Sequence, residues 1–423
     1  MRIDFSTPAG MSRRHFMQHL AGASAMAIPA LHFTSTLRAN AAELQKNQKS
    51  VILLWMGGGP ATIDIWDLKP GSATGGPFKP IATTGDMQIS EHLPLMAKQM
   101  HNMSIVRSMS TREADHGRGR YYMHTGYVPN PNVQHPSYGA VVAHELEKTR
   151  TELEIPPFVS VGGGSAGPGF LGMAYAPFVV NSNGRVQDLA MGIDADRVSD
   201  RMRFLNQLEA SFIRQKRGGA PQEHAKVLAK TQVLMTSQQM DAFKVNLEPA
   251  EVREQYGDSN FGRGCLMARR LVETGVPFIE VDMGGWDTHQ QNFDRLQTML
   301  PTMDQAMSAL VVDLEQRGML DNVAIVWLGE FGRTPTINGN SGRDHWARSW
   351  SAVVGGAGFQ RGVAIGETSA DGMSVETEPY TSEDLMASVL HSVGISLDTR
   401  FTASNGRPMK IANGGRLIKG LIA

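Results

Sequence analysis

Short apolar segments alternate with helical patterns along most of this chain, and this alternation limits its possible fold more than any other feature. The apolar segments are nearly continuous runs, a pattern typical of parallel strands that are covered on both faces of a sheet. We predict strands at residues 50–56, 104–107, 158–161, 276–281, 323–328 and 352–354. Strands that alternate with helices in this way predict a doubly wound, mainly parallel α/β sheet.

The clearest helical pattern spans residues 289–316, where apolar side chains fall on one stripe of the predicted helix. Gly318 is placed to end this helix, because glycine readily adopts the left-handed conformation that follows a helix. Near the C-terminus, Thr381 is predicted to cap a helix that ends at Gly394. The stripe of the first helix consists of Phe293, Leu296, Leu300, Met303, Met307, Leu310 and Leu314.

Residues 188–274 differ from the rest of the chain, because they are charged, rich in glutamine and helical in pattern, without a convincing strand. We interpret them as a helical insertion beside the sheet, within one domain that covers residues 42–423.

Residues 1–41 have the organisation of a twin-arginine export signal. Arg13 and Arg14 precede an alanine-rich, weakly apolar stretch at 20–33, and a small-x-small triplet suitable for signal peptidase follows at 39–41. The apolar stretch is too short and interrupted to span a bilayer permanently, and no later segment approaches a span. We therefore expect a periplasmic or secreted protein that uses the twin-arginine machinery, a route that carries folded cargo.

Composition excludes several classes of function. A net charge of −1 gives no electrostatic reason to expect nucleic-acid binding. The single cysteine, Cys265, cannot form an internal disulfide, and its apolar helical surroundings favour a buried structural thiol over a nucleophile. An oxidoreductase is disfavoured, because the chain has neither a dinucleotide fingerprint nor a set of cysteine ligands.

Three polar clusters begin where predicted strands end. Residues 57–60 follow the first strand, with Asp64 just beyond, while residues 282–289 and 329–333 follow two later strands. Ligands bind outside the carboxyl ends of strands in open α/β sheets. The three clusters therefore predict one shared site.

The cluster at 282–289 and a further segment at 342–346 each carry a residue pair that suits a metal ion. Asp287 and His289 lie two residues apart in a glycine-rich loop, and Asp344 and His345 repeat the oxygen–nitrogen chemistry beside Arg343. Alone, Asp287 and His289 are at least as typical of a capping Asp and a surface His. Alone, the segment with Asp344 and His345 is typical of a hydrogen-bonded loop with a buried tryptophan. Together they favour a divalent cation such as Zn²⁺, Mn²⁺, Fe or Ca²⁺, with Arg343 suited to an anionic substrate.

A fourth cluster spans residues 116–127, after the strand at 104–107. Its glycine-rich start and two arginines can present backbone N–H groups and guanidinium groups to an oxyanion. The same residues also fit the solvated, basic start of a helix. We favour the anion-binding interpretation.

Five segments resemble motifs of an exported family called domain of unknown function 1501. They are GGGPATIDIWDLKP (57–70), HGRGRYYMHTG (116–126), GGWDTH (284–289), GEFGRTP (329–335) and GRDHW (342–346). The family is placed in the alkaline phosphatase and sulfatase superfamily. The resemblance therefore implies an alkaline phosphatase-like sheet with metals at the strand ends.

The resemblance also implies roles for individual residues. Asp287, His289 and His345 match the ligands of one metal of the superfamily. Glu330 stands at the position of an aspartate ligand of a second metal, but Phe331 occupies the place of its histidine partner. Further predicted ligands are Asp64, which is displaced from the superfamily position, and Asp344.

The superfamily nucleophile lies nine residues before the Thr-Gly pair that matches Thr125 and Gly126, and here that position is His116. His116 is then a nucleophile, a metal ligand, or a neighbour of an attacking water activated by the metal. Ser110 and Thr111 lie nearby as alternative nucleophiles. Arg120 matches the sulfatase arginine.

We thus predict an exported metal-dependent hydrolase of phosphate or sulfate esters, acting on an anionic small molecule or glycan. His116, Glu330 and Arg120 are the candidate catalytic residues, with Glu330 as general base or further ligand. The alternative is a catalytically degenerate binding protein of the cell envelope on the same fold. The candidate substrate-binding residues are Arg333, Arg343 and Thr125.

Overall fold

The core of the protein is an eight-stranded sheet with the order β12-β4-β11-β8-β1-β7-β5-β6. The computed structural model describes residues 48–184, 195–214, 227–228, 230–231 and 233–423, so the predicted export signal lies outside the described residues. Residues 49–423 form one compact unit. The strands are β1 (Ser50–Trp55), β4 (Met103–Met109), β5 (Phe158–Val161), β6 (Phe178–Val180), β7 (Phe278–Asp282), β8 (Val323–Leu328), β11 (Trp350–Gly356) and β12 (Ala364–Ile365).

Strand direction determines which loops meet. Strand β1 lies between β7 and β8 and is parallel to both, with Val51 opposite Phe278 on one side and Ala324 on the other. Strand β11 runs antiparallel to its neighbours β4 and β8. The carboxyl ends of β1, β4, β7 and β8 therefore lie at the edge of the sheet where β11 begins. The predicted mainly parallel α/β fold is confirmed.

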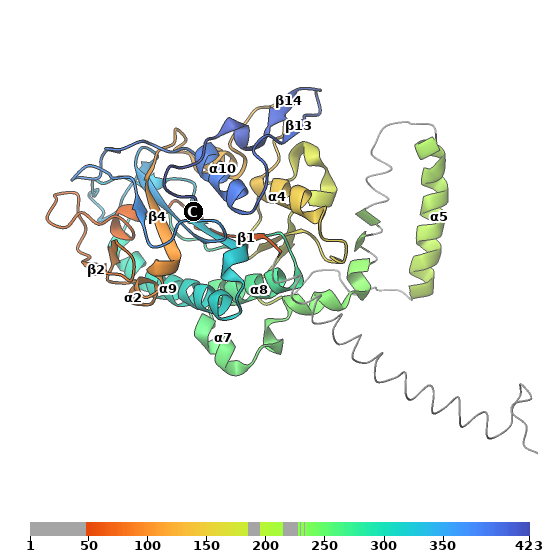
Figure 1. Cartoon of the computed structure of the whole chain (residues 1–423), viewed down its shortest axis with the longest axis horizontal. Helices are drawn as coiled ribbons and strands as arrows, with labels where there is room; N and C mark the ends of the chain where they lie inside the picture. The colour runs from red at the N-terminus through yellow and green to blue at the C-terminus, as the bar shows by residue number, and fades with distance from the viewer. Residues whose placement is uncertain (1–47, 185–194, 215–226, 229, 232) are drawn as a thin grey trace, which may run out of the picture. The chain divides into compact units, whose positions relative to one another are not determined.

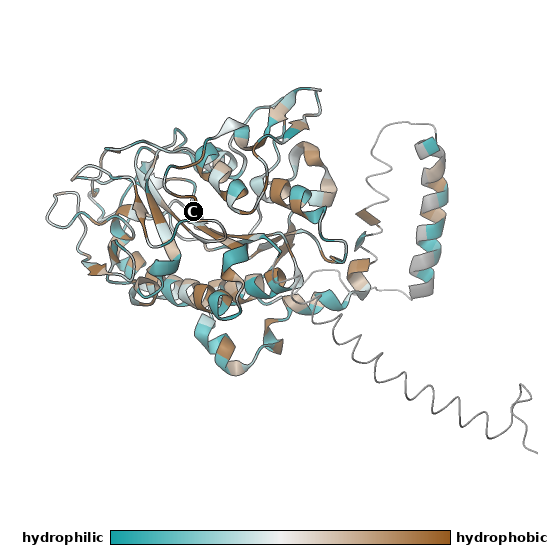
Figure 2. Ribbon diagram, in the orientation of Figure 1, coloured by the Kyte–Doolittle hydropathy of each residue, from teal (hydrophilic) through white to brown (hydrophobic). Residues whose placement is uncertain are grey.

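Helices cover both faces of the sheet because the side chains of each strand alternate between two apolar cores. Ile52 and Leu54 of β1 join the core formed with α8 and α9, whereas Val51 and Leu53 join the core formed with α4 and α10. Figure 1 shows these layers, and Figure 2 shows hydrophobic residues concentrated on the strands between them. The helices are α3 (His116–Thr125), α4 (Tyr138–Glu147), α8 (Asn260–Thr274), α9 (Asn292–Gln316) and α10 (Ser382–Ser392).

The predicted helix at 289–316 begins three residues later in the structure, at Asn292. Gln291 has a left-handed backbone (φ 49°), so the residues before it belong to a loop instead of a first helical turn. The C-terminal helix begins as expected: Thr381 and Asp384 form a reciprocal capping box. Gly394 follows this helix with φ 80°.

The described part of residues 188–274 contains helices and no strand. The last of these helices, α8, packs against α9 and β7, so it belongs to the layer that covers the sheet. No helix among the described residues is both long and apolar enough to cross a membrane. The other helices and strands are α2 (Pro94–Ala97), α5 (Ala195–Arg214), α7 (Ala250–Tyr256), β2 (Pro80–Ala82), β3 (Gln88–Ser90), β9 (Gly332–Arg333), β10 (His345–Trp346), β13 (Arg400–Thr402) and β14 (Pro408–Lys410).

Candidate metal centre

The loops that carry the predicted site residues meet at the carboxyl edge of the sheet. The short strands β9 and β10 pair antiparallel, which sets His345 opposite Arg333. The loop before β10 is joined to the loop after β7 by a hydrogen bond from Arg343 N to the Thr288 carbonyl (3.0 Å). These backbone contacts bring the residues after β7 and before β11 into one site.

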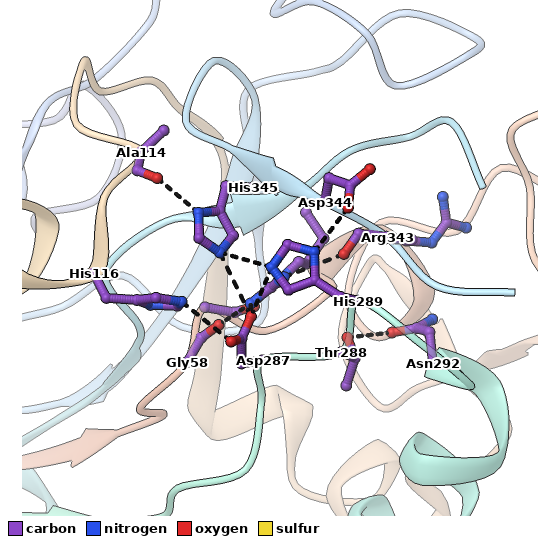
Figure 3. A network of polar contacts seen from close by, with 12 residues as sticks. Gly58, Ala114, His116, Asp287, Thr288, His289, Asn292, Arg343, Asp344 and His345 are labelled. Carbon is purple, nitrogen blue, oxygen red and sulfur yellow. Dashed lines mark hydrogen bonds and ion pairs between the residues drawn. The ribbon is translucent and has the colours of Figure 1, made fainter. Parts of the chain in front are cut away.

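Asp287 lies at the centre of this site, between three histidines (Figure 3). Its Oδ1 is 3.1 Å from His289 Nε2 and 3.5 Å from His345 Nε2, and its Oδ2 is 3.4 Å from His116 Nε2. The two Nε2 atoms of His289 and His345 are 3.0 Å apart. One ligand atom each of His116, Asp287 and His345 lies within 4.8 Å of the others.

Each imidazole is oriented by a contact to its other ring nitrogen. This arrangement is typical of metal-binding histidines, whose second nitrogen usually donates to a carboxylate or carbonyl. The Nδ1 contacts are His116 with Glu330 Oε1 (2.7 Å), His289 with Asp344 Oδ1 (2.7 Å) and His345 with the Ala114 carbonyl oxygen (2.7 Å).

The contact of His345 decides its tautomer. A carbonyl oxygen only accepts hydrogen bonds, so Nδ1 of His345 carries the proton. Burial lowers the pKa of His345 below its ordinary value, which favours the neutral ring. The Nε2 lone pair of the neutral ring then faces the carboxylate of Asp287 and the Nε2 of His289. These atoms are donors that a shared cation could use as ligands.

Arg333 holds Asp287 in place and does not reach solvent. Its guanidinium donates to the carbonyl oxygens of Gly59 (2.8 Å), Gly58 and Arg343 (3.1 Å) and to the Asp287 carboxylate. Partial burial raises the pKa of Asp287, but the bonded Arg333 outweighs this effect, so the pKa of Asp287 lies below its ordinary value. The buried position of Arg333 argues against the predicted contact with substrate.

Glu330 is a buried support for His116. Its side chain is 4% exposed, accepts from Gly58 N (3.0 and 3.2 Å) and contacts His116 Nδ1. Both carboxylate oxygens thus have partners within the protein. Phe331, which follows it, packs its ring 5.2 Å from that of His116 and 4.7 Å from that of His345.

Asp64 and Arg343 form a buried ion pair outside this cluster. Arg343 Nε donates to Asp64 Oδ2 (2.7 Å), and Arg343 Nη2 donates to Asp64 Oδ1 (2.8 Å). The side-chain amide of Asn292 also donates to Asp64 Oδ2 (2.8 Å). The pair joins the loop after β1 to the loop before β10. The structure therefore does not bring Asp64 to the histidines, and the full burial of Arg343 argues against contact with an anionic substrate.

Arg120 is turned toward a second acidic cluster. Its terminal nitrogen is 3.8 Å from Glu280 Oε1 and 3.9 Å from Asp282 Oδ2, and it donates to the Gly164 carbonyl. Two carboxylates thus already neutralise much of its charge. His124 Nε2 lies 3.1 Å from the same Glu280 oxygen.

Helix α3 positions both clusters, because His116, Arg120 and His124 are four residues apart and share one face of the helix. The sequence analysis assigned no role to Glu280, and none to His124 although His124 lies in the cluster at 116–127. The available signal was the single carboxylate of Glu280 inside an otherwise apolar strand, since a buried charge requires a partner. That partner comes from α3 and could not be named from the strand alone.

Thr125 and Cys265 lie away from the metal cluster. Thr125 is buried, and its hydroxyl donates to the Tyr121 carbonyl (2.7 Å) at the end of α3, so it supports the helix and not a substrate. Cys265 is buried on α8, and burial raises the pKa of its thiol far above the ordinary value. A thiol in this state is a structural residue.

This chain is therefore an α/β protein with a mainly parallel sheet and a cluster of histidines and carboxylates at the ends of its strands. Residues 48–422 match the model of a family described as "Protein of unknown function (DUF1501)". The chain belongs to that family. No curated protein matches its sequence.

Several solved structures are similar to the chain at low sequence identity. One is the PsFucS1 sulfatase from Pseudoalteromonas sp., at 13% sequence identity and a TM-score of 0.39, with 84% of this chain and 70% of that one covered. Another is the phosphonate monoester hydrolase SpPMH from Silicibacter pomeroyi, at 11% sequence identity and a TM-score of 0.37, with 88% of this chain and 76% of that one covered. A protein in the alkaline phosphatase superfamily from Vibrio parahaemolyticus is similar at 11% identity (TM-score 0.36, 88% and 69%).

Proposed function

We propose that this protein is an exported, metal-dependent hydrolase of phosphate or sulfate esters. The observation that carries the proposal is the arrangement around His345, whose neutral ring directs an Nε2 lone pair at His289 Nε2 and at the carboxylate of Asp287. The proposed metal ligands are His116, Asp287, His289 and His345.

The donor set fits a borderline divalent cation. Three imidazole nitrogens and one carboxylate oxygen suit Zn²⁺, Mn²⁺ or Fe²⁺, whereas Ca²⁺ prefers oxygen donors. The side chains of His116, His289 and Asp287 are 38%, 42% and 46% exposed, so the cluster is open to a substrate from solvent. When bound, such a cation supplies positive charge and Lewis acidity to an anionic ester.

The protein's own cations contribute little to substrate attraction at this site. Arg333 and Arg343 are buried, and Arg120 is paired with carboxylates. We therefore assign Arg333 and Glu330 to positioning: Arg333 holds Asp287, and Glu330 holds His116. In this scheme His116 is an exposed imidazole that binds the cation or transfers a proton.

Metal content tests the proposal directly. We expect the purified wild-type protein to contain about one equivalent of a transition metal, and His345→Ala to lose most of it because one ligand is removed. His391→Ala is the matched control, because His391 is exposed on α10 away from the cluster. Equal metal content in all three proteins, measured by inductively coupled plasma mass spectrometry, would refute the proposed centre.

Turnover distinguishes the hydrolase from a binding protein. The side chains that contact the Asp287 carboxylate are three histidines and Arg333, and none of these offers a hydroxyl or thiol nucleophile. This composition is what favours the alternative of a degenerate envelope binding protein. Hydrolysis of aryl phosphate or sulfate esters that depends on added Mn²⁺ or Zn²⁺ and on His345 supports the enzyme. Metal binding without any hydrolysis supports the alternative.

A further inference from the structure

A cavity away from the metal cluster opens at the C-terminal end of α3. Its volume is about 560 Å³, a size that accommodates a small organic ligand. The walls come from the end of α3, the loop after β4, the β13–β14 hairpin and the residues that follow it. Neither the metal ligands nor their supporting residues line this cavity.

Cations dominate the charge of the cavity. Arg112, Arg407 and Lys410 line it, and Glu383 is the single carboxylate among the lining residues. The Glu383 carboxylate already accepts from the Tyr122 hydroxyl (2.5 Å). Among the described residues, none of these three cations forms an ion pair with a carboxylate. By contrast, Arg118 and Arg120 of α3 are both paired with carboxylates.

An aromatic and amide wall lies beside these cations. The rings of Tyr127 and His135 stack in parallel, with centroids 4.0 Å apart. Burial and the nearby Arg407 both lower the pKa of His135, so this ring adds apolar surface and not charge. Asn413 lines the cavity with a left-handed backbone (φ 50°), a conformation that non-glycine residues adopt at some cost and often at binding sites.

We propose that this cavity is a binding site for an acidic oligosaccharide, whose sulfate or carboxylate groups meet Arg112, Arg407 and Lys410. Guanidinium groups bind such oxyanions in a bidentate manner. The apolar face of a sugar ring packs on an aromatic side chain such as Tyr127. This site would hold a glycan independently of any reaction at the metal cluster.

Calorimetric titration with a sulfated chondroitin tetrasaccharide tests the inference. We expect wild type to bind it and to bind neutral maltotetraose, inorganic sulfate and hexaglutamate each about tenfold more weakly, since only the first offers both anion and ring. Arg407→Gln and Lys410→Gln should each weaken binding about tenfold through the lost charged hydrogen bonds. Arg253→Gln, an exposed arginine on α7, is the matched control and should leave binding unchanged.

The outcomes separate this site from the metal cluster. His345→Ala should bind the tetrasaccharide as wild type does; loss of binding in that variant would place the ligand at the metal cluster and overturn the inference. Equal binding of hexaglutamate would show that the cavity recognises acidic peptides instead of sugars. Absence of binding in wild type, or equal losses in Arg407→Gln and Arg253→Gln, would also overturn it.

Discussion

Asp287 is the residue on which the candidate centre depends, because three imidazoles and one guanidinium converge on its carboxylate. Arg333 is the buried member of this group and bonds both to Asp287 and to the loop after β1. The proposed ligand geometry therefore requires a residue that would itself never touch the cation.

Replacement of Arg333 tests this indirect role. Arg333→Met keeps much of the buried volume but removes the hydrogen bonds to Asp287 and the Gly58 and Gly59 carbonyls. We expect metal affinity to fall about 10- to 100-fold, the range typical for supporting residues of metal sites. Titration against a competing chelator measures it, with Arg361→Met as the control at a partly exposed arginine. Unchanged affinity would contradict the positioning role.

At the scale of elements, one buried arginine connects the two helices that cover one face of the sheet. Arg269 of α8 is 1% exposed and ion-paired with Glu248 (2.8 Å), Glu273 (2.7 Å) and Asp313 of α9 (2.9 Å). The Tyr256 hydroxyl also donates to Asp313 (2.9 Å). The contact between α8 and α9 thus contains a buried network of ion pairs in addition to its apolar packing.

Removal of this arginine takes one cationic partner from three carboxylates, although Glu248 keeps Arg270, and Glu273 and Asp313 keep Arg317. We expect Arg269→Met to lower the free energy of unfolding by about 1.5–3 kcal/mol, the range of a lost charged hydrogen bond, because the carboxylates keep other cationic partners. Denaturation in urea, followed by circular dichroism, measures the change. Arg253→Met on the exposed face of α7 should change stability by less than about 0.5 kcal/mol. A similar effect of both substitutions would show that the network contributes little.

Acid should weaken the same network. Burial raises the pKa of Glu248, but Arg269 and Arg270 outweigh it, so the folded-state pKa lies below the unfolded value of 4.5. A depressed carboxyl pKa contributes stability that is present above pH 4.5 and is lost as the pH falls through the folded-state value. As the pH falls from 5 through the folded-state pKa of Glu248, we expect the free energy of unfolding to decrease less in Arg269→Met than in wild type. If the free energy of unfolding fell equally with pH in wild type and in Arg269→Met, this expectation would be contradicted.

At the scale of the whole molecule, the proposed cation would link residues from three segments: the loop after β4, the loop after β7, and the segment between β8 and β11. A ligand that binds only the folded state stabilises it by about 2.7 kcal/mol at a concentration of 100 Kd. We therefore expect chelation to lower the Tm of the wild-type protein, and added Zn²⁺ or Mn²⁺ to restore it. Differential scanning fluorimetry measures both shifts. His345→Ala should show neither, and a chelator effect of equal size in that variant would argue against this site.

Export is a second property of the whole molecule. The structure does not describe residues 1–47, so the twin-arginine signal remains a proposal. We expect the double substitution Arg13→Lys and Arg14→Lys to retain the protein in the cytoplasm, because the export machinery reads the arginine pair. Immunoblots of cytoplasmic and periplasmic fractions measure the distribution, with Lys46→Arg as the control. Periplasmic accumulation of the double variant would exclude this route.

Local pattern in the sequence predicted six of the eight strands of the central sheet, and the two that it missed, β6 and β12, are short edge strands. The strands at 158–161 and 323–328 coincide with β5 and β8, and the cap at Thr381 and stop at Gly394 bound α10 as expected. Burial and backbone geometry act over a few residues, so the periods of apolar side chains and the capping residues report them directly. Polar loops at strand ends likewise indicated where a site would form.

Strand direction and pairing were decided only by the tertiary structure. Strand β11 runs antiparallel, and this orientation carries His345 to the edge where Asp287 lies. Burial then separated residues of the same type: Arg343 pairs with Asp64, whereas Arg407 faces an open cavity. These contacts join residues far apart in the chain, and their energies depend on distance and solvent access, which no local pattern encodes. The sequence by itself therefore determined the elements and the chemistry of the loops, while only the folded chain determined which side chains meet.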